Sequence, residues 1–136
     1  MLTMTTAVRT SEARERLLRT ASDLFYAEGL RGVGVDRVVA EASVTRATFY
    51  RHFPAKEDLV VAYLQGVDRS VREGAGEVPG DAAGAARWLD GLTALVGDTV
   101  CGVGFRGCAF INAAAEYPDP ESAVRRAVRV LSLIHI

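Results

Sequence analysis

The sequence lacks several features that would place it in other protein classes. Its 136 residues contain no unbroken apolar run of about 18, which is the length that a membrane-spanning helix needs. The first ten residues lack a basic segment followed by an apolar one, so we expect no secretory signal and a cytoplasmic location. The two cysteines, Cys101 and Cys108, are too few for a disulfide framework.

The residues that usually carry catalysis are also scarce. The chain has two histidines, His52 and His135, and no nucleophile motif, phosphate-binding loop or cluster of metal ligands. Cys108 has no Lys or His near it in sequence to activate its thiol, so we interpret it as a small buried residue instead of a redox sensor. We therefore expect no enzyme, no cofactor and no metal.

The composition is that of a soluble globular protein of one domain, or of a small domain and part of another. Hydrophobic residues make up 49% of the chain, charged residues 24%, and the net charge is −1. The charge is unevenly distributed, because residues 31–56 carry a local +3 and the remainder carries −4. That local positive charge suits contact with nucleic-acid phosphates.

Residues 35–53 have the pattern of two short helices joined by a tight turn. Thr45 can cap the second helix by accepting an N–H bond from its first turn. Phe49 and Phe53, four residues apart, direct one side of that helix inward. The first helix has four apolar residues at the spacing of one buried face: Val35, Val38, Val39 and Ala42.

The other side of the second helix carries hydrogen-bond donors and no acid. These residues are Arg46, Thr48, Tyr50, Arg51 and His52. The major groove of DNA accepts one helix, and base edges and phosphates present acceptors to such side chains. The pattern favours a DNA-reading helix, and the alternative is an ordinary solvated helix in a small bundle.

The landmarks of a known family appear in order along this part of the chain. They are LF..EG, TFYRHF and KEDL, within the run RERLLRTASDLFYAEGLRGVGVDRVVAEASVTRATFYRHFPAKEDLVVAYL. Over roughly Glu12 to Val71 the sequence resembles the N-terminal domain of the tetracycline-repressor-like (TetR) family of transcriptional regulators. The combination is more specific than any one piece of it.

The resemblance implies an all-α fold. We expect a flexible arm over residues 1–10, a three-helix DNA-binding domain over 11–55 with its helix-turn-helix motif at 35–53, and a connecting helix with a partial ligand-binding and dimerisation domain over 56–136. Family members are usually longer, so this helical bundle is expected to be truncated. The last six residues, LSLIHI at 131–136, fit a helix poorly and are interpreted as a non-native tail.

Individual helix boundaries follow from local signals. Ser11 and Glu12 are typical of a helix start, and Gly29 of a helix end. Ser43 stands where the family usually has Gly, so we expect a strained left-handed turn there. The family often has Thr where this chain has Gly34 and Val35, which removes a hydroxyl cap and a phosphate contact.

The family motif also assigns roles to individual positions in DNA binding. Four residues at the start of the recognition helix approach the bases: Thr45, Arg46, Ala47 and Thr48. Arg46 is the candidate for a bidentate contact with guanine. Three residues occupy phosphate-contact positions: Tyr50, His52 and Lys56. The partner is then a double-stranded DNA operator.

The second half of the chain contains less specific sequence signals. Residues 74–84 form a loop rich in Gly, a helix follows from Trp88, a short helix spans 109–116, and Asp119-Pro120-Glu121 starts the last helix. By resemblance this region binds a small molecule, and its candidate residues are Trp88, Phe105, Phe110, Asn112 and Tyr117. Aromatic residues at helical spacing are also typical of plain core.

These patterns together predict a ligand-responsive repressor. The resemblance implies binding to a palindromic operator as a homodimer, with release when an unknown small-molecule inducer shifts the fourth helix. The helices through which full-length members dimerise are not recognisable here, which weighs against a dimer of this chain. The alternative is a truncated helical protein-interaction domain without regulatory activity.

Overall fold

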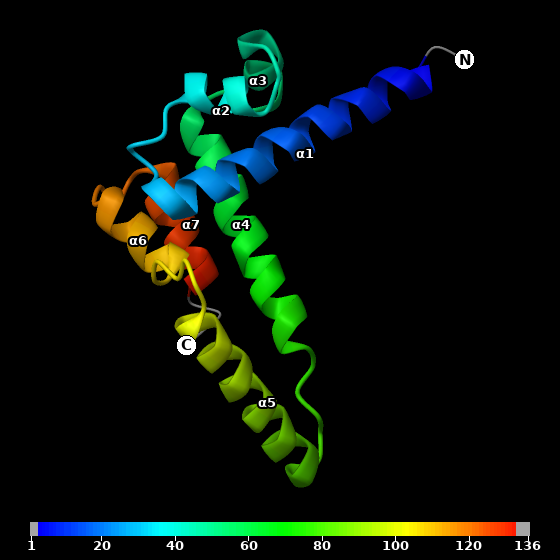
Figure 1. Cartoon of the computed structure of the whole chain (residues 1–136), viewed down its shortest axis with the longest axis vertical. Coiled ribbons are helices and arrows are strands. Elements are labelled where there is room, and N and C mark those ends of the chain that lie inside the picture. The colour runs from blue at the N-terminus through cyan, green and yellow to red at the C-terminus, as the bar shows by residue number, and fades with distance from the viewer. Residues whose placement is uncertain (1–2, 133–136) are drawn as a thin grey trace.

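The protein is all-helical over the part that its computed structural model describes, residues 3–132, with side chains over 12–131. Figure 1 shows a long first helix, α1, crossing the top of a central helix, α4. Two short helices, α2 and α3, lie at the upper end of α4, and α6 and α7 lie beside it. No helix among the described residues is both long and apolar enough to cross a membrane.

The first helix, α1, spans Thr3–Glu28 and begins earlier than the sequence predicts. We expected a flexible arm up to residue 10 and a helix start at Ser11, but the helix is continuous from Thr3. No Gly or Pro occurs between Thr3 and Glu28, so nothing in the backbone interrupts it. The expected end is confirmed, because Gly29 follows with φ 90°, a left-handed conformation that suits glycine.

The two predicted motif helices are present as α2 (Val35–Glu41) and α3 (Arg46–His52). Between them Ser43 has φ 54°, the one non-glycine residue with positive φ among the described residues. The strained turn is therefore confirmed. Val38, Val39, Phe49 and Phe53 are buried, so both helices present the predicted faces to the core.

The central helix, α4, spans Lys56–Ala75 and connects the two parts of the molecule. We call residues 12–55 the head and residues 56–131 the body. Head and body share one hydrophobic cluster, which runs from Leu17 in α1 through Leu59 and Leu64 in α4 to Val124 and Val128 in α7. The arrangement of α3 is thus fixed by packing that continues into the body.

The fifth helix, α5, spans Ala82–Cys101 and extends away from the rest of the body (Figure 1). The loop before it is shorter than predicted, because α4 continues to Ala75 and Asp81 caps α5 by accepting from the Gly84 N–H at 2.8 Å. Several large apolar side chains of α5 are exposed: Leu89, Leu95, Val96 and Val100.

The last two described helices are α6 (Ala109–Glu116) and α7 (Ala123–Ser132). The predicted bounds of α6 are confirmed, but α7 starts three residues later than expected. Asp119 caps a turn instead, accepting from the Glu121 N–H, and the Ser122 hydroxyl accepts from Arg125 N–H at 3.0 Å in the first turn of α7. Cys108 precedes α6 and is exposed, which corrects the expectation of burial. Of the predicted tail 131–136, residues 133–136 lie outside the described part.

Candidate DNA-binding surface

The start of α3 is fixed by a side-chain cap. The Thr45 hydroxyl oxygen accepts from the Thr48 N–H at 3.1 Å, and the two threonine hydroxyls lie 2.9 Å apart. The cap predicted from the sequence is therefore confirmed. It satisfies one of the free N–H groups at the helix start and makes the first turn rigid, which pre-organises the side chains beside it.

One side of α3 points away from the core, and we call it the α3 outer face. It consists of Arg46, Ala47, Tyr50 and Arg51, which are exposed, with the half-buried Thr48 and His52 at its edge. Tyr50 packs its ring edge-on against buried Phe49, with centroids 5.0 Å apart, and this contact restricts its orientation. The predicted base-contact and phosphate-contact residues of α3 are thus brought together on one surface.

Arg46 has a partner that the sequence did not suggest. One of its guanidinium nitrogens lies 2.7 Å from Oδ1 of Asp36, in the first turn of α2. Both side chains are largely exposed, at 62% for Arg46 and 75% for Asp36. An exposed ion pair of this kind is weak, so the guanidinium can exchange Asp36 for another acceptor.

His52 occupies a different environment from its neighbours. Its ring is half-buried, and its Nε2 atom is buried without a hydrogen-bond partner. Burial lowers the pKa of His52, and the positive charges of Arg51 and Arg14 lower it further. The imidazole therefore favours its neutral form, in which it brings no charge to the surface.

Lys56, at the start of α4, adjoins the α3 outer face through the short segment 53–55. Burial lowers the pKa of Lys56, while the nearby carboxylate of Glu116 raises it and the positive charge of Arg31 lowers it. The first turn of α4 is stabilised by Asp58, whose Oδ2 accepts from the Ala55 N–H at 2.8 Å. The backbone of Lys56 is thus fixed in the first turn of a helix that starts three residues after Phe53.

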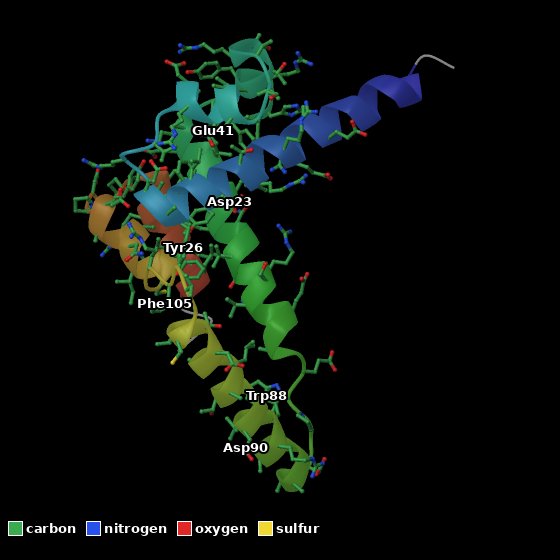
Figure 2. All side chains as sticks on the ribbon, in the orientation of Figure 1. Asp23, Tyr26, Glu41, Trp88, Asp90 and Phe105 are labelled. Atoms are coloured by element: carbon green, nitrogen blue, oxygen red, sulfur yellow. The ribbon has the colours of Figure 1, made fainter. Side chains whose placement is uncertain are left out.

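The predicted ligand-binding residues do not meet in one pocket. Trp88 lies on α5, where its indole N–H donates to the Ala75 carbonyl, and Figure 2 shows it well away from Phe105. A cleft of about 340 Å³ includes Asn112, and a second of about 320 Å³ includes Phe110. Phe105 is 42% exposed and Tyr117 packs at the edge of the core.

The larger cleft lies where α1, α4 and α6 meet. Its lining includes Tyr26, Tyr63, Arg106, Asn112 and Glu116. Burial raises the pKa of the Tyr63 hydroxyl to about 12, so this group stays protonated at neutral pH. No group of three or more metal-ligating side chains gathers here or elsewhere within the described residues.

Three residues with clear structural roles escaped the sequence analysis: Asp36, Tyr26 and Glu116. Asp36 was visible as an acid in a helix start, but its contact with Arg46 depends on the angle between α2 and α3. Tyr26 and Glu116 contact residues about 80 positions away in sequence, as described below, and no local pattern signals such pairs.

The part of the chain that carries this surface is similar to known proteins. Residues 17–63 match the family model described as bacterial regulatory proteins, tetR family. The transcriptional regulator SrpR of Pseudomonas putida is 34% identical over 59 residues, covering 43% of this chain and 28% of SrpR. The transcriptional activator FasR of Mycolicibacterium smegmatis is 37% identical over 54 residues, covering 40% of this chain and 25% of FasR.

The likeness extends to the body in a solved structure. The crystal structure of SCO4454, a TetR-family transcriptional regulator from Streptomyces coelicolor, superposes with a TM-score of 0.80 at 50% identity. The match covers 91% of this chain and 66% of SCO4454. The match thus spans about a quarter of SrpR and of FasR and just under two thirds of SCO4454.

Proposed function

Because residues 17–63 make this chain a member of the TetR family, we propose that it is a sequence-specific DNA-binding transcriptional regulator of the cytoplasm. Its mode of action is repression: it binds a palindromic operator as a dimer and is released by a small-molecule inducer. The α3 outer face carries this proposal, since exposed donors stand there on a capped helix and no acidic side chain belongs to α3.

Each residue of the surface has a distinct role in this proposal. Arg46 exchanges Asp36 for the O6 and N7 acceptors of a guanine, while Thr45, Ala47 and Thr48 approach neighbouring bases. Tyr50, His52 and Lys56 contact phosphates and position the helix without reading sequence. The two hydroxyls of Thr45 and Thr48 already bond to each other, so Arg46 carries most of the discrimination.

The inducer in this proposal is a small molecule bound where the body meets the head. Of the two clefts described above, the one of about 340 Å³ is the better candidate for the inducer site, because residues of α1, α4 and α6 all line it. A molecule bound there contacts both head and body, which is what release of DNA requires. Of the five residues predicted from the sequence, Asn112 lines this cleft.

Binding to DNA is tested by selecting an operator from random-sequence duplexes with the wild-type protein and titrating it by fluorescence anisotropy. Arg46→Ala should lower discrimination at one base step by about 1–3 kcal/mol. The matched control is Arg69→Ala, which removes the same charge from an exposed position on α4 and should leave discrimination unchanged. If no duplex is enriched over background, the proposed function is wrong.

A protein-interaction domain without regulatory activity remains the competing function. It would need neither the basic segment 31–56 nor donors on the α3 outer face, and it would bind no operator. A reporter gene placed behind the selected operator distinguishes repression from activation, and the similar protein FasR is a transcriptional activator. Family membership is consistent with the expectation of no enzymatic activity.

A further inference from the structure

The end of α1 lies beside α6 (Figure 1), and hydrogen bonds join the two at both ends of α6. The Tyr26 hydroxyl accepts from the Arg106 N–H at 2.9 Å and donates to the Gly107 carbonyl at 3.1 Å, just before α6 begins. At the other end, the Glu116 carboxylate accepts from the N–H groups of Leu30 and Arg31, at 2.9 and 2.8 Å. Figure 2 shows Tyr26 where α1 meets α6.

The Glu116 contact is built from several independent features. One carboxylate satisfies two adjacent N–H groups in the turn that leads from α1 into α2, and charge makes both bonds stronger than neutral ones. Gly29 provides the space, because a Cβ there would lie 3.3 Å from a Glu116 oxygen. Arg31 also lies over the ring of Tyr117, the residue after Glu116, at 5.4 Å from the centroid.

These contacts place the carboxylate between the turn before α2 and the start of α4. On one side it fixes the turn before α2, and α2 in turn carries Asp36, the partner of Arg46. On the other side it lies near Lys56 at the start of α4, whose pKa responds to its charge. Glu116 is therefore a single α6 side chain that binds the segment leading into the helix-turn-helix motif and also lies near Lys56, the proposed phosphate contact.

We propose that Glu116 is a positioning residue for DNA binding, which ties the helix-turn-helix motif to α6 so that a displacement of α6 is transmitted to the head. The inference rests on the proposed regulatory function and specifies how the body controls it. A ligand in the adjacent cleft, which Glu116 itself lines, acts by shifting α6 and weakening these two hydrogen bonds.

Three variants test the inference in the full chain. Glu116→Ala removes both acceptors, and Glu116→Gln keeps one carbonyl oxygen and so retains one of the two bonds. Glu121→Gln is the control, since it removes the same charge from an exposed residue of the turn between α6 and α7. The control is necessary because any loss of an acid favours DNA binding.

Amide hydrogen exchange and operator titration are the two measurements. Relative to Glu121→Gln, Glu116→Ala should exchange the amides of Leu30 and Arg31 faster and bind the selected operator about tenfold more weakly, within the usual range of coupling between sites. Glu116→Gln should fall between the two. The melting temperature of Glu116→Ala should fall somewhat, because two charge-assisted hydrogen bonds are lost. The added exchange should be confined to the segment around Leu30 and Arg31, whereas a merely structural role would raise exchange in all helices.

The outcomes separate this inference from the proposed function. Unchanged exchange at Leu30 and Arg31, or an operator affinity equal to that of Glu121→Gln, would overturn the role of Glu116. A wild-type chain that selects no operator would overturn the proposed function and with it the DNA-positioning role, while the exchange data still decide whether the contact holds the motif.

Discussion

The guanidinium of Arg46 and the carboxylate of Asp36 lie 2.7 Å apart, joining the starts of α3 and α2. The ion pair spans the helix-turn-helix motif. It engages Arg46, the residue that we assign to guanine recognition. If Arg46 binds a guanine as we propose, that contact competes with the ion pair to Asp36. We therefore expect the ion pair to lower operator affinity modestly.

Asp36→Asn should consequently strengthen operator binding. Removing the competing carboxylate frees the guanidinium and removes a negative charge from the surface, for a gain of about 1 kcal/mol, or roughly fivefold in Kd. Glu41→Gln is the matched control, because Glu41 lies on the same helix and pairs with Arg37 instead. Anisotropy titration at fixed salt measures both, and equal gains in the two variants would contradict competition at Arg46.

Lys56 should set salt dependence without affecting sequence preference. Lys56→Ala removes one phosphate contact, so the slope of log affinity against log salt should flatten by about 1, with all sequences weakened alike. Lys56→Arg keeps the charge and should preserve the slope. Titrations of operator and random duplexes over a range of salt concentrations test this, and an unchanged slope in Lys56→Ala would remove Lys56 from the DNA contacts.

A glycine in place of Ser43 should make the fold more stable. Its φ of 54° costs a non-glycine residue free energy, so Ser43→Gly should stabilise the fold by about 0.5–1 kcal/mol after the extra chain entropy of glycine is subtracted. Ser70→Gly, at an exposed position inside α4, should destabilise by a similar amount. Urea unfolding compares the two, and a loss of stability in Ser43→Gly would mean that the turn is unstrained.

His52 should make the fold sensitive to acid. Since its pKa is lowered in the folded state, the unfolded chain binds more protons near its ordinary pKa of about 6.5. Its stabilising contribution is fully present above pH 6.5 and is lost as the pH falls through the folded pKa. His52→Gln should lose less stability than wild type between pH 7 and 5, measured by thermal unfolding. The difference isolates His52 from His135.

Local sequence signals predicted much of the head correctly because they act over a few residues. The Thr45 cap, the end of α1 at Gly29 and the strained Ser43 turn each depend on neighbours within one helical turn. The bounds of α6 follow likewise from the glycines before it and Pro118 after it. The start of α7 was misplaced because Asp119 and Ser122 both offer a capping oxygen, and Ser122 is the one used.

Contacts between residues far apart in the chain could not be predicted from local sequence patterns. The five predicted ligand-binding residues were chosen by side-chain type, but Trp88 extends with α5 while Phe110 and Asn112 line separate clefts beside α6. The Glu116 contact joins residues 85 and 86 positions apart. Such pairs are set by how α6 packs beside α1, which helical periodicity does not specify.

The unbroken hydrophobic cluster between Leu17 and Val128 limits how the two halves can move. A hinge swings about a few exposed residues, whereas tightly interdigitated side chains allow only shear, with helices sliding past one another by about 1–2 Å. Regulation in this molecule would therefore be a small shear of one helix against another within the hydrophobic cluster. The response to a ligand would then depend on the free energy of repacking those aliphatic side chains.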